Sequence, residues 1–205
     1  MIGSKVHARI LARFEDVDFT VFQFGIDVAA TQALMGVGTD LLNFDVPSRS
    51  DPLRIFRLGN DGFHPTGEAL EIGSGGGAVA AQLLHEFPEL RIIATDYDPE
   101  LVAVTAQSLK PFGQRATVNR ADAAALPFAD GRFDVVLSFA MFHHIPNWEW
   151  AVAEAMRVLR PGGTLVGYDL SRLRQLETEL RRLPAHRVRT RRSLGGLLLR
   201  FQVIK

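Results

Sequence analysis

The chain has 205 residues, of which 47% are hydrophobic and 22% charged, which excludes a largely disordered protein and allows one ordinary domain with a short appendage. It contains no cysteine, which excludes disulfides, thiolate metal ligands and a cysteine nucleophile, and no metal site is predicted. No apolar run approaches the ~20 residues that span a bilayer, and the first residues do not resemble a signal peptide. A cytoplasmic protein without a membrane span is therefore expected.

The net charge is zero, but the charges are unevenly distributed along the chain. From Ser171 to Lys205 there are ten basic and two acidic residues, whereas the preceding 170 residues carry thirteen basic and twenty-one acidic ones. A basic segment can meet RNA or an anionic membrane. The preferred interpretation is that these arginines coat a surface helix and protect an edge hairpin, because the interleaved aromatic residues of a nucleic-acid stacking surface are missing. Nucleic acid is therefore not the predicted partner.

Residues 1–66 have the least regular pattern and are predicted to form a separate N-terminal segment. Turn-forming residues at 47–52 mark a plausible break in the chain. Aromatic side chains at Phe14, Phe19, Phe22, Phe24 and Phe44 suggest packing rather than cofactor binding. The segment is expected to cover the substrate or to make a subunit contact, and a homodimer formed through it is one expectation.

From residue 67 to 205 strand-like and helix-like segments alternate, which predicts a second domain. Strands are expected at 69–72, 90–95, 116–120, 133–139 and 164–168, helices at 78–87, 99–109, 148–159 and 171–183, and a terminal hairpin at 187–192 and 197–204. Asn147 is predicted to cap the third helix, and Asp134 to be a buried structural residue of the fourth strand. The pattern predicts an α/β fold: a doubly wound, mostly parallel, seven-stranded Rossmann-like sheet with a C-terminal antiparallel hairpin.

A glycine-rich loop lies between the first strand and the first helix of this domain. Residues 73–77 contain four glycines in five positions. Such a turn brings a ligand close to the backbone and presents the first N–H groups of the helix to it. The order Gly73-x-Gly75-x-x-Ala78 also satisfies the loose dinucleotide fingerprint, so the loop alone leaves a nicotinamide cofactor open.

Three carboxylates lie close to the ends of the first three strands. Glu71 precedes the glycine loop, Asp96 follows the second strand and Asp122 follows the third. In open parallel sheets ligands bind beyond the carboxyl ends of the strands. A nicotinamide cofactor needs one acid there, for its ribose, whereas S-adenosylmethionine could use three, with its ribose hydroxyls, adenine amino group and ammonium group.

Five motifs along the chain resemble, in their order and spacing, those of the class I S-adenosylmethionine-dependent methyltransferases. They are most similar to the small-molecule branch that includes the ubiquinone and menaquinone biosynthesis enzymes. The motifs are Leu70-Glu71-Ile72-Gly73-Ser74-Gly75-Gly76-Gly77, Ala94-Thr95-Asp96-Tyr97-Asp98-Pro99, Asp122-Ala123-Ala124-Ala125-Leu126-Pro127-Phe128, Phe133-Asp134-Val135-Val136 and Leu159-Arg160-Pro161-Gly162-Gly163-Thr164-Leu165. They cover about half of the chain. The resemblance implies S-adenosyl-L-methionine as the cofactor and a small molecule as the substrate.

The resemblance also implies roles for the loop residues and the acid before them. The backbone of Gly73, Gly75 and Gly77 would line the methionine part of the cofactor, and Ser74 is a further predicted cofactor contact. Glu71 would lie near the cofactor's ammonium group.

Further contacts with the adenosine part of the cofactor are implied beyond the second and third strands. Asp96 would accept hydrogen bonds from both ribose hydroxyls, for which its two oxygens are suited. Tyr97 would flank the adenine. Asp122 would accept from the adenine amino group, and the Ala123 N–H would donate to the ring.

The end of the fourth strand is where the resemblance places the chemistry. Ser138 or Phe139 would face the methyl group that is transferred. His143 and His144 follow directly and are the candidate general bases, because histidine is the side chain that ordinarily titrates near neutral pH. A base is needed only if the acceptor atom arrives protonated.

The sequence leaves three alternatives to a small-molecule methyltransferase. Only a short helix precedes the terminal hairpin, where relatives usually carry a substrate-covering insertion, so a catalytically weak cofactor-binding relative remains an alternative. An NAD(P)-dependent oxidoreductase is disfavoured because neither Tyr97 nor Tyr168 begins a Tyr-x-x-x-Lys motif. An RNA methyltransferase is disfavoured because an Asn-Pro-Pro-Tyr-type signature is missing after the fourth strand. The acceptor itself is not identified.

Overall fold

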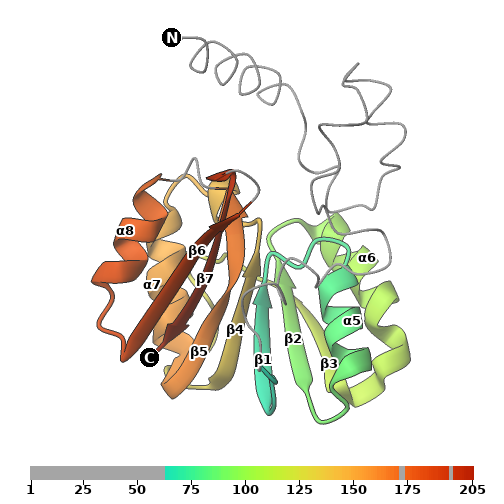
Figure 1. Cartoon of the computed structure of the whole chain (residues 1–205). Coiled ribbons are helices and arrows are strands. Elements are labelled where there is room, and N and C mark those ends of the chain that lie inside the picture. Colours follow the sequence, from blue (N-terminus) through green and yellow to red (C-terminus); the bar gives the residue numbers. More distant parts are fainter. Residues whose placement is uncertain (1–62, 171–173, 194–195) are drawn as a thin grey trace, which may run out of the picture. The chain divides into compact units, whose positions relative to one another are not determined.

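The computed structural model describes residues 63–205, except for 171–173 and 194–195, and these residues belong to one compact unit (Figure 1). The predictions made for residues 1–66, a substrate cap or dimer segment, fall almost wholly outside the described residues. No helix within the described part of the chain is long and apolar enough to cross a membrane.

The described residues form a seven-stranded sheet in the order β3-β2-β1-β4-β5-β7-β6 (Figure 1). Neighbouring strands from β3 to β5 are parallel, and β7 pairs antiparallel with both β5 and β6. This confirms the predicted mostly parallel sheet with a C-terminal hairpin. The strands are β1 (Glu68–Ile72), β2 (Arg91–Asp96), β3 (Ala116–Arg120), β4 (Phe133–Phe139), β5 (Leu159–Leu170), β6 (Arg187–Ser193) and β7 (Leu198–Ile204).

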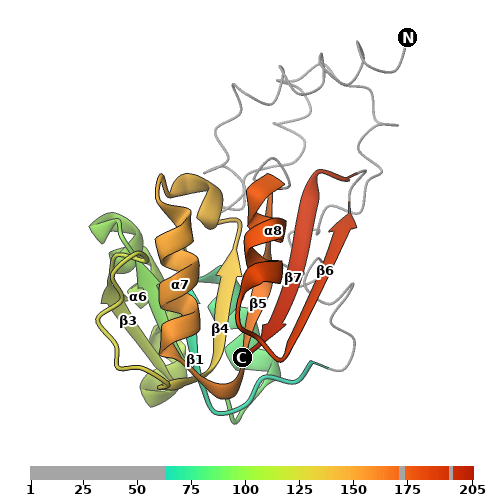
Figure 2. The ribbon, with the colours of Figure 1, turned by 90° about the vertical axis from the view of Figure 1, so that its left-hand side faces the viewer.

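Helices cover the two faces of the sheet in separate places (Figures 1 and 2). One face carries α5 (Ala78–Glu86) and α6 (Pro99–Leu109) beside β1, β2 and β3, and the opposite face carries α7 (Trp148–Val158) and α8 (Arg174–Arg182) beside β4, β5 and β7. Two short 3-10 helices, η2 (Lys110–Arg115) and η3 (Phe142–His144), follow α6 and β4. The sheet therefore separates two apolar layers, one on each face.

The central strand β4 shows why the sequence forms such a sheet. Its apolar run has no alternation with polar residues, and Phe133, Val135, Val136 and Leu137 are all buried. A strand buried on both faces needs apolar residues at successive positions. The continuous apolar run of residues 133–139 thus agrees with a strand buried on both faces.

Asp134 is the polar exception near the start of β4, and its predicted structural role agrees with its contacts. Its carboxylate accepts from the Glu68 N–H at 2.7 Å and from Arg160 Nε, and so fastens β4 to β1 and β5. Its side chain is 29% exposed rather than buried, because it lies at the rim of the sheet.

Two local predictions are wrong in detail. Asn147 occupies the N-cap position of α7, but its side chain makes no capping hydrogen bond; instead its carbonyl accepts from the Trp150 N–H. The fifth strand begins at Leu159 rather than at 164, because Leu159 already pairs with Phe133 before the register shifts. Residues 160–163, which follow α7 and were predicted as a turn, therefore lie within the irregular first part of β5.

Candidate functional site

The carboxyl ends of β1 and β4 meet at the point where the strand order of the sheet reverses. From β1 the chain runs outward through β2 to β3, then returns to pair β4 with the other side of β1. In doubly wound sheets such a switch point opens a crevice in which ligands bind. The glycine-rich loop leaves β1 at this point.

The glycine loop has the backbone geometry that the sequence predicted. Gly73, Gly75 and Gly77 have φ of 69°, 53° and 78°, in the left-handed region that favours glycine. A Cβ at Gly73 would lie 2.2 Å from Met141 Cγ, in the loop after β4, so no side chain fits there. The loops from β1 and β4 therefore pack directly against each other.

Hydrogen bonds from β2 and α6 hold the glycine loop in place. The Ser74 N–H donates to the Thr95 carbonyl at 2.9 Å, and the Thr105 hydroxyl donates to the Gly75 carbonyl. Ser74 is buried, with its Oγ 3.5 Å from Thr105 Oγ1. Ser74, predicted as a cofactor contact, therefore directs its hydroxyl toward Thr105 of α6. Its backbone N–H helps to hold the loop in place. Thr105, which had no assigned role, is part of this support.

Asp96 ends β2 beside the glycine loop and is buried. Its Oδ2 accepts from the Gly75 N–H at 2.9 Å and its Oδ1 accepts from the Asp98 N–H at 3.1 Å. Each carboxylate oxygen can accept more than one hydrogen bond, so acceptor capacity remains. Two backbone N–H groups thus hold the carboxylate in a fixed orientation at the switch point.

Glu71 lies one residue before the end of β1, with only 2% of its surface exposed. The N–H of Ala80, in the first turn of α5, donates to its carboxyl group. Its Oε2 has no hydrogen-bond partner among the described residues. Burial, followed by the nearby charge of Asp96, raises the pKa of Glu71 to about 8. A buried carboxyl with an unused oxygen is matched to a ligand that brings a cation or a donor.

The residues predicted to hold adenine lie beyond the ends of β2 and β3 and are more open. Tyr97 is 66% exposed, and the Arg120 guanidinium lies 5.3 Å from the centre of its ring. Asp122 is exposed and accepts from the Ala124 N–H at 2.9 Å, which forms a tight turn. Ala123 is partly buried against the core. The structure brings these residues to the same edge of the sheet as Asp96.

Ser138 and Phe139, predicted to face the transferred methyl group, lie on opposite faces of β4. Both are buried. Phe139 packs against Tyr168 of β5, with ring centres 5.4 Å apart, on the face that carries Glu71. Ser138 lies close to Gly167, where an added Cβ would come within 1.8 Å of the Ser138 carbonyl oxygen. Of the two, Phe139 shares its face of the sheet with the glutamate.

His143 has a buried acidic partner that the sequence did not identify. Its Nδ1 lies 2.7 Å from Asp169 Oδ1, and the same carboxylate accepts from the Phe142 N–H at 2.8 Å. Asp169 is fully buried and the His143 side chain is 5% exposed. His144 is exposed, and its ring centre lies 4.0 Å from that of His143. The structure therefore separates an anchored histidine from an exposed one.

Asp169 could have been found by the signal that revealed Asp96. It stands near the end of β5 as Asp96 ends β2, and neighbouring parallel strands place their ends at one edge. Its pairing with His143 depends on the path of η3, which the sequence does not specify.

Ala140, between β4 and η3, is another position without a sequence signal. Its φ is 50°, which makes it the one residue other than glycine with positive φ among the described residues. Its N–H donates to the Tyr168 carbonyl at 2.8 Å, which holds the turn against β5. Such backbone outliers cost free energy and cluster at functional sites.

Sheet order, glycine loop and strand-end carboxylates together define a Rossmann-like methyltransferase fold. Residues 70–167 match the model of a family described as a methyltransferase domain. A demethylmenaquinone methyltransferase from Thermus thermophilus is 35% identical over 97 residues, which cover 47% of this chain and 44% of that protein. A ubiquinone/menaquinone biosynthesis C-methyltransferase from Dinoroseobacter shibae is 37% identical over 109 residues, covering 51% of this chain and 42% of that protein. The matches thus span less than half the length of these curated relatives.

Solved structures agree in fold at lower sequence identity. A SAM-dependent methyltransferase from Aquifex aeolicus matches with a TM-score of 0.62 and 17% identity, over 81% of this chain and 97% of that chain. Phosphoethanolamine N-methyltransferase 2 from Haemonchus contortus, in complex with S-adenosyl-L-methionine, matches with a TM-score of 0.66 and 16% identity, over 77% and 53%. Residues 70–167 of this chain are therefore similar to a methyltransferase domain, and the chain is similar to ubiquinone and menaquinone biosynthesis methyltransferases over about half of its length.

Proposed function

We propose that the protein transfers a methyl group from S-adenosyl-L-methionine to a small-molecule acceptor. The observation that carries this proposal is the convergence of the glycine loop, Glu71 and Asp96 at the switch point of the sheet. A nicotinamide cofactor has no ammonium group to pair with the buried carboxyl of Glu71, whereas S-adenosylmethionine does.

The described residues fit the cofactor. The unused Oε2 of Glu71 suits an ammonium group, and the remaining acceptor capacity of Asp96 suits ribose hydroxyls. The backbone of Gly73 and Gly75 lets a ligand approach closely, since neither carries a side chain. Tyr97 and Asp122, beyond the ends of β2 and β3, are the residues we assign to the adenine ring. When bound, the cofactor supplies an electrophilic methyl group on a sulfonium.

The main task of the protein is then to align the acceptor with that methyl group and to exclude water. Alignment alone can contribute ~7–11 kcal/mol to lowering a barrier. A proton must also be removed when the acceptor atom is a protonated carbon or oxygen, as in a quinol ring. The names of the curated relatives make such a ring the first acceptor to test.

We assign proton removal to His144, with His143 and Asp169 as positioning residues. His144 is the exposed member of the pair and stands just beyond β4. Asp169, as a carboxylate, accepts from His143 Nδ1–H and so fixes the tautomer and the orientation of that ring. The His143 ring lies 4.0 Å from that of His144 at a tilt of 38° and so limits the directions in which the exposed histidine can point.

Calorimetric titration tests cofactor choice directly. We expect S-adenosylmethionine and its demethylated product S-adenosylhomocysteine to bind and NAD not to bind. Binding of NAD alone would overturn the proposal. Formation of S-adenosylhomocysteine in the presence of demethylated quinols then tests the acceptor class.

The catalytically weak cofactor-binding relative remains a second candidate. The observation that favours it is the short connection between β5 and the hairpin, in which α8 spans nine residues. Tight binding of both cofactor forms, without turnover on quinol, phenol or amine acceptors, is the result that this candidate predicts.

A further inference from the structure

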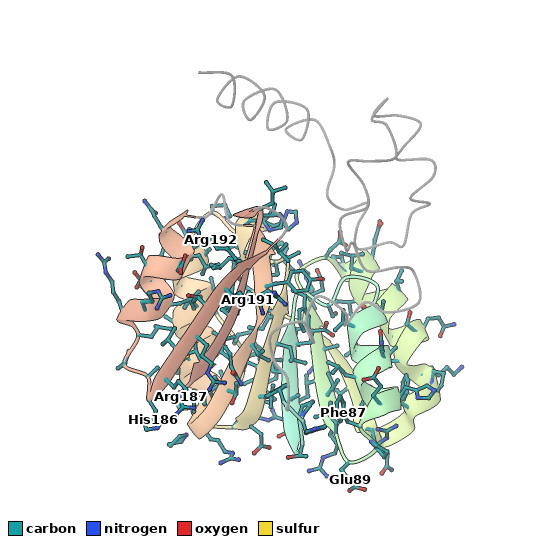
Figure 3. The ribbon with its side chains drawn as sticks, viewed as in Figure 1. Phe87, Glu89, His186, Arg187, Arg191 and Arg192 are labelled. Atoms are coloured by element: carbon teal, nitrogen blue, oxygen red, sulfur yellow. The ribbon has the colours of Figure 1, made fainter. Side chains whose placement is uncertain are left out.

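The C-terminal hairpin and β5 share a sheet face, here called the arginine face, on the side opposite α7 and α8. It is formed by alternate residues of β6, β7 and β5. Its exposed part is β6, whereas Val166 of β5 and Leu198 of β7 are buried. Arg187, Arg189 and Arg191 of β6 belong to it and are all exposed. In Figures 1 and 2 no described helix lies over this side of β6 and β7, and Figure 3 labels Arg187 and Arg191 along β6.

The arginines on the two sides of β6 differ in their ion pairing. On the α8 side, Arg192 binds Glu177 at 2.9 Å, and Arg181 of α8 binds the same glutamate at 3.1 Å. Within the described part of the chain, by contrast, Arg187, Arg189 and Arg191 make no ion pair and no side-chain hydrogen bond. Within the described residues, arginines on the α8 side of β6 are thus paired with a carboxylate, and those on the other side are not.

Strand register adds a fourth arginine to this face. Arg200 of β7 lies directly opposite Arg191 and beside Tyr168 of β5, and it is buried. Like charges directly opposite each other in a sheet destabilise it. The remaining positions on this side of β7 and β5 carry no carboxylate: Leu198, Gln202, Ile204, Thr164, Val166 and Leu170.

Protection of an edge strand is one reason for arginines on β6, but it does not explain their arrangement. Edge protection needs a charged side chain on the edge strand, and Arg192 already provides one on the α8 side of β6. It does not require three arginines on one side without a carboxylate partner among the described residues, in a chain whose net charge is zero. The arrangement is typical of a surface that binds anionic groups of another molecule.

We propose that the arginine face docks on an anionic lipid bilayer. Alternate residues of a strand lie roughly 7 Å apart, so the three arginines of β6 form a flat row that can meet several headgroup phosphates at once. Arginine binds phosphate oxygens through paired donors. Leu197, at the hairpin turn, is 40% exposed and provides an apolar contact beside the end of β5.

The same features disfavour RNA as the partner. Sequence-independent binding of single strands needs aromatic side chains on which bases stack. Tyr168 is the sole aromatic residue among the described positions of this face, and it is partly buried against Phe139. The row of arginines reaches the level of Tyr168, close to the strand ends that carry the cofactor site. A docked molecule would therefore hold its site near the membrane surface, whatever reaction it catalyses.

Vesicle sedimentation tests the proposal with the full chain. Vesicles of phosphatidylcholine mixed equally with phosphatidylglycerol should bind the protein, and vesicles of phosphatidylcholine alone should not. Each basic residue near an anionic surface strengthens binding roughly fivefold. The triple variant R187Q/R189Q/R191Q should therefore bind on the order of 100-fold more weakly, and R187K/R189K/R191K should retain most of the binding.

A matched control removes three arginines on the α8 side of the sheet, Arg181 and Arg182 of α8 and Arg192 of β6. The variant R181Q/R182Q/R192Q loses the same charge but leaves the arginine face intact, so it should bind like the wild type. Equal loss in both triple variants would show a response to net charge alone and would overturn the proposal. Binding of a labelled single-stranded RNA by the arginine face, without binding of anionic vesicles, would overturn it in favour of a nucleic-acid surface.

Discussion

Replacing Glu71 by glutamine removes a buried carboxyl group while keeping the shape of the side chain and an oxygen for the Ala80 N–H. The pKa of Glu71 is raised from 4.5 to about 8, first by burial and then by Asp96. The folded protein therefore holds this proton more tightly than the unfolded chain does. The stabilising contribution of the protonated carboxyl is fully present below about pH 4.5 and is lost as the pH rises through about 8.

The size of this effect follows from about 1.4 kcal/mol for each unit of pKa. Between pH 5 and pH 8 the wild type should lose roughly 3 kcal/mol of its free energy of unfolding through Glu71. Glu71→Gln lacks this loss. Its free energy of unfolding relative to the wild type should therefore rise by roughly 3 kcal/mol across the same interval, since all other groups titrate in both proteins.

Urea unfolding, followed by tryptophan fluorescence at pH 5, 6, 7 and 8, measures this difference. Glu89→Gln is the control, because it removes a carboxylate at an exposed position where solvent screens the charge (Figure 3). A difference between Glu71→Gln and the wild type that stays constant with pH would refute the reasoning. So would a variant less stable than the wild type at pH 8.

Three further predictions concern the cofactor, the proposed base and the turn after β4. Asp96→Asn should weaken S-adenosylmethionine binding about 10- to 100-fold in calorimetry, because charged hydrogen bonds contribute about 1.5–3 kcal/mol; unchanged affinity would contradict the role of Asp96. His144→Gln should lower turnover of a quinol acceptor by ~10²–10⁴-fold without changing cofactor affinity. Asp169→Asn should lower it as well and shift its pH profile, and an unaltered profile would leave Asp169 a purely structural residue. Ala140→Val should reduce the free energy of unfolding by about 1–3 kcal/mol relative to Ala140→Gly, because a β-branched residue is strained at positive φ.

The order of helices and strands could be read from the sequence because each element of the methyltransferase domain carries its own local signal. The apolar run at 133–139 is typical of a strand buried on both faces, and Pro99 suits the first position of the helix expected at 99–109, which α6 confirms. The two wrong predictions concern residues whose local sequence signal is overridden by hydrogen bonding in the folded chain. Asn147 has the chemistry of a cap, yet its side chain is not used as one, and Leu159 joins β5 early because Phe133 is available to pair with it.

The sequence by itself determined the glycine loop, Glu71 and the acids at the strand ends, because parallel strands bring their carboxyl ends to one edge whatever their side chains are. Only the tertiary structure decided the burial, the hydrogen-bond partners and the neighbouring charges of the functional groups. Burial of Glu71 beside Asp96 raises its pKa, and the path of η3 joins His143 to Asp169. Strand register gathers the arginines of β6 on a side of the sheet where the described residues of β5 and β7 carry no carboxylate. These properties depend on distances between residues far apart in the chain, and a local sequence pattern contains no such distances.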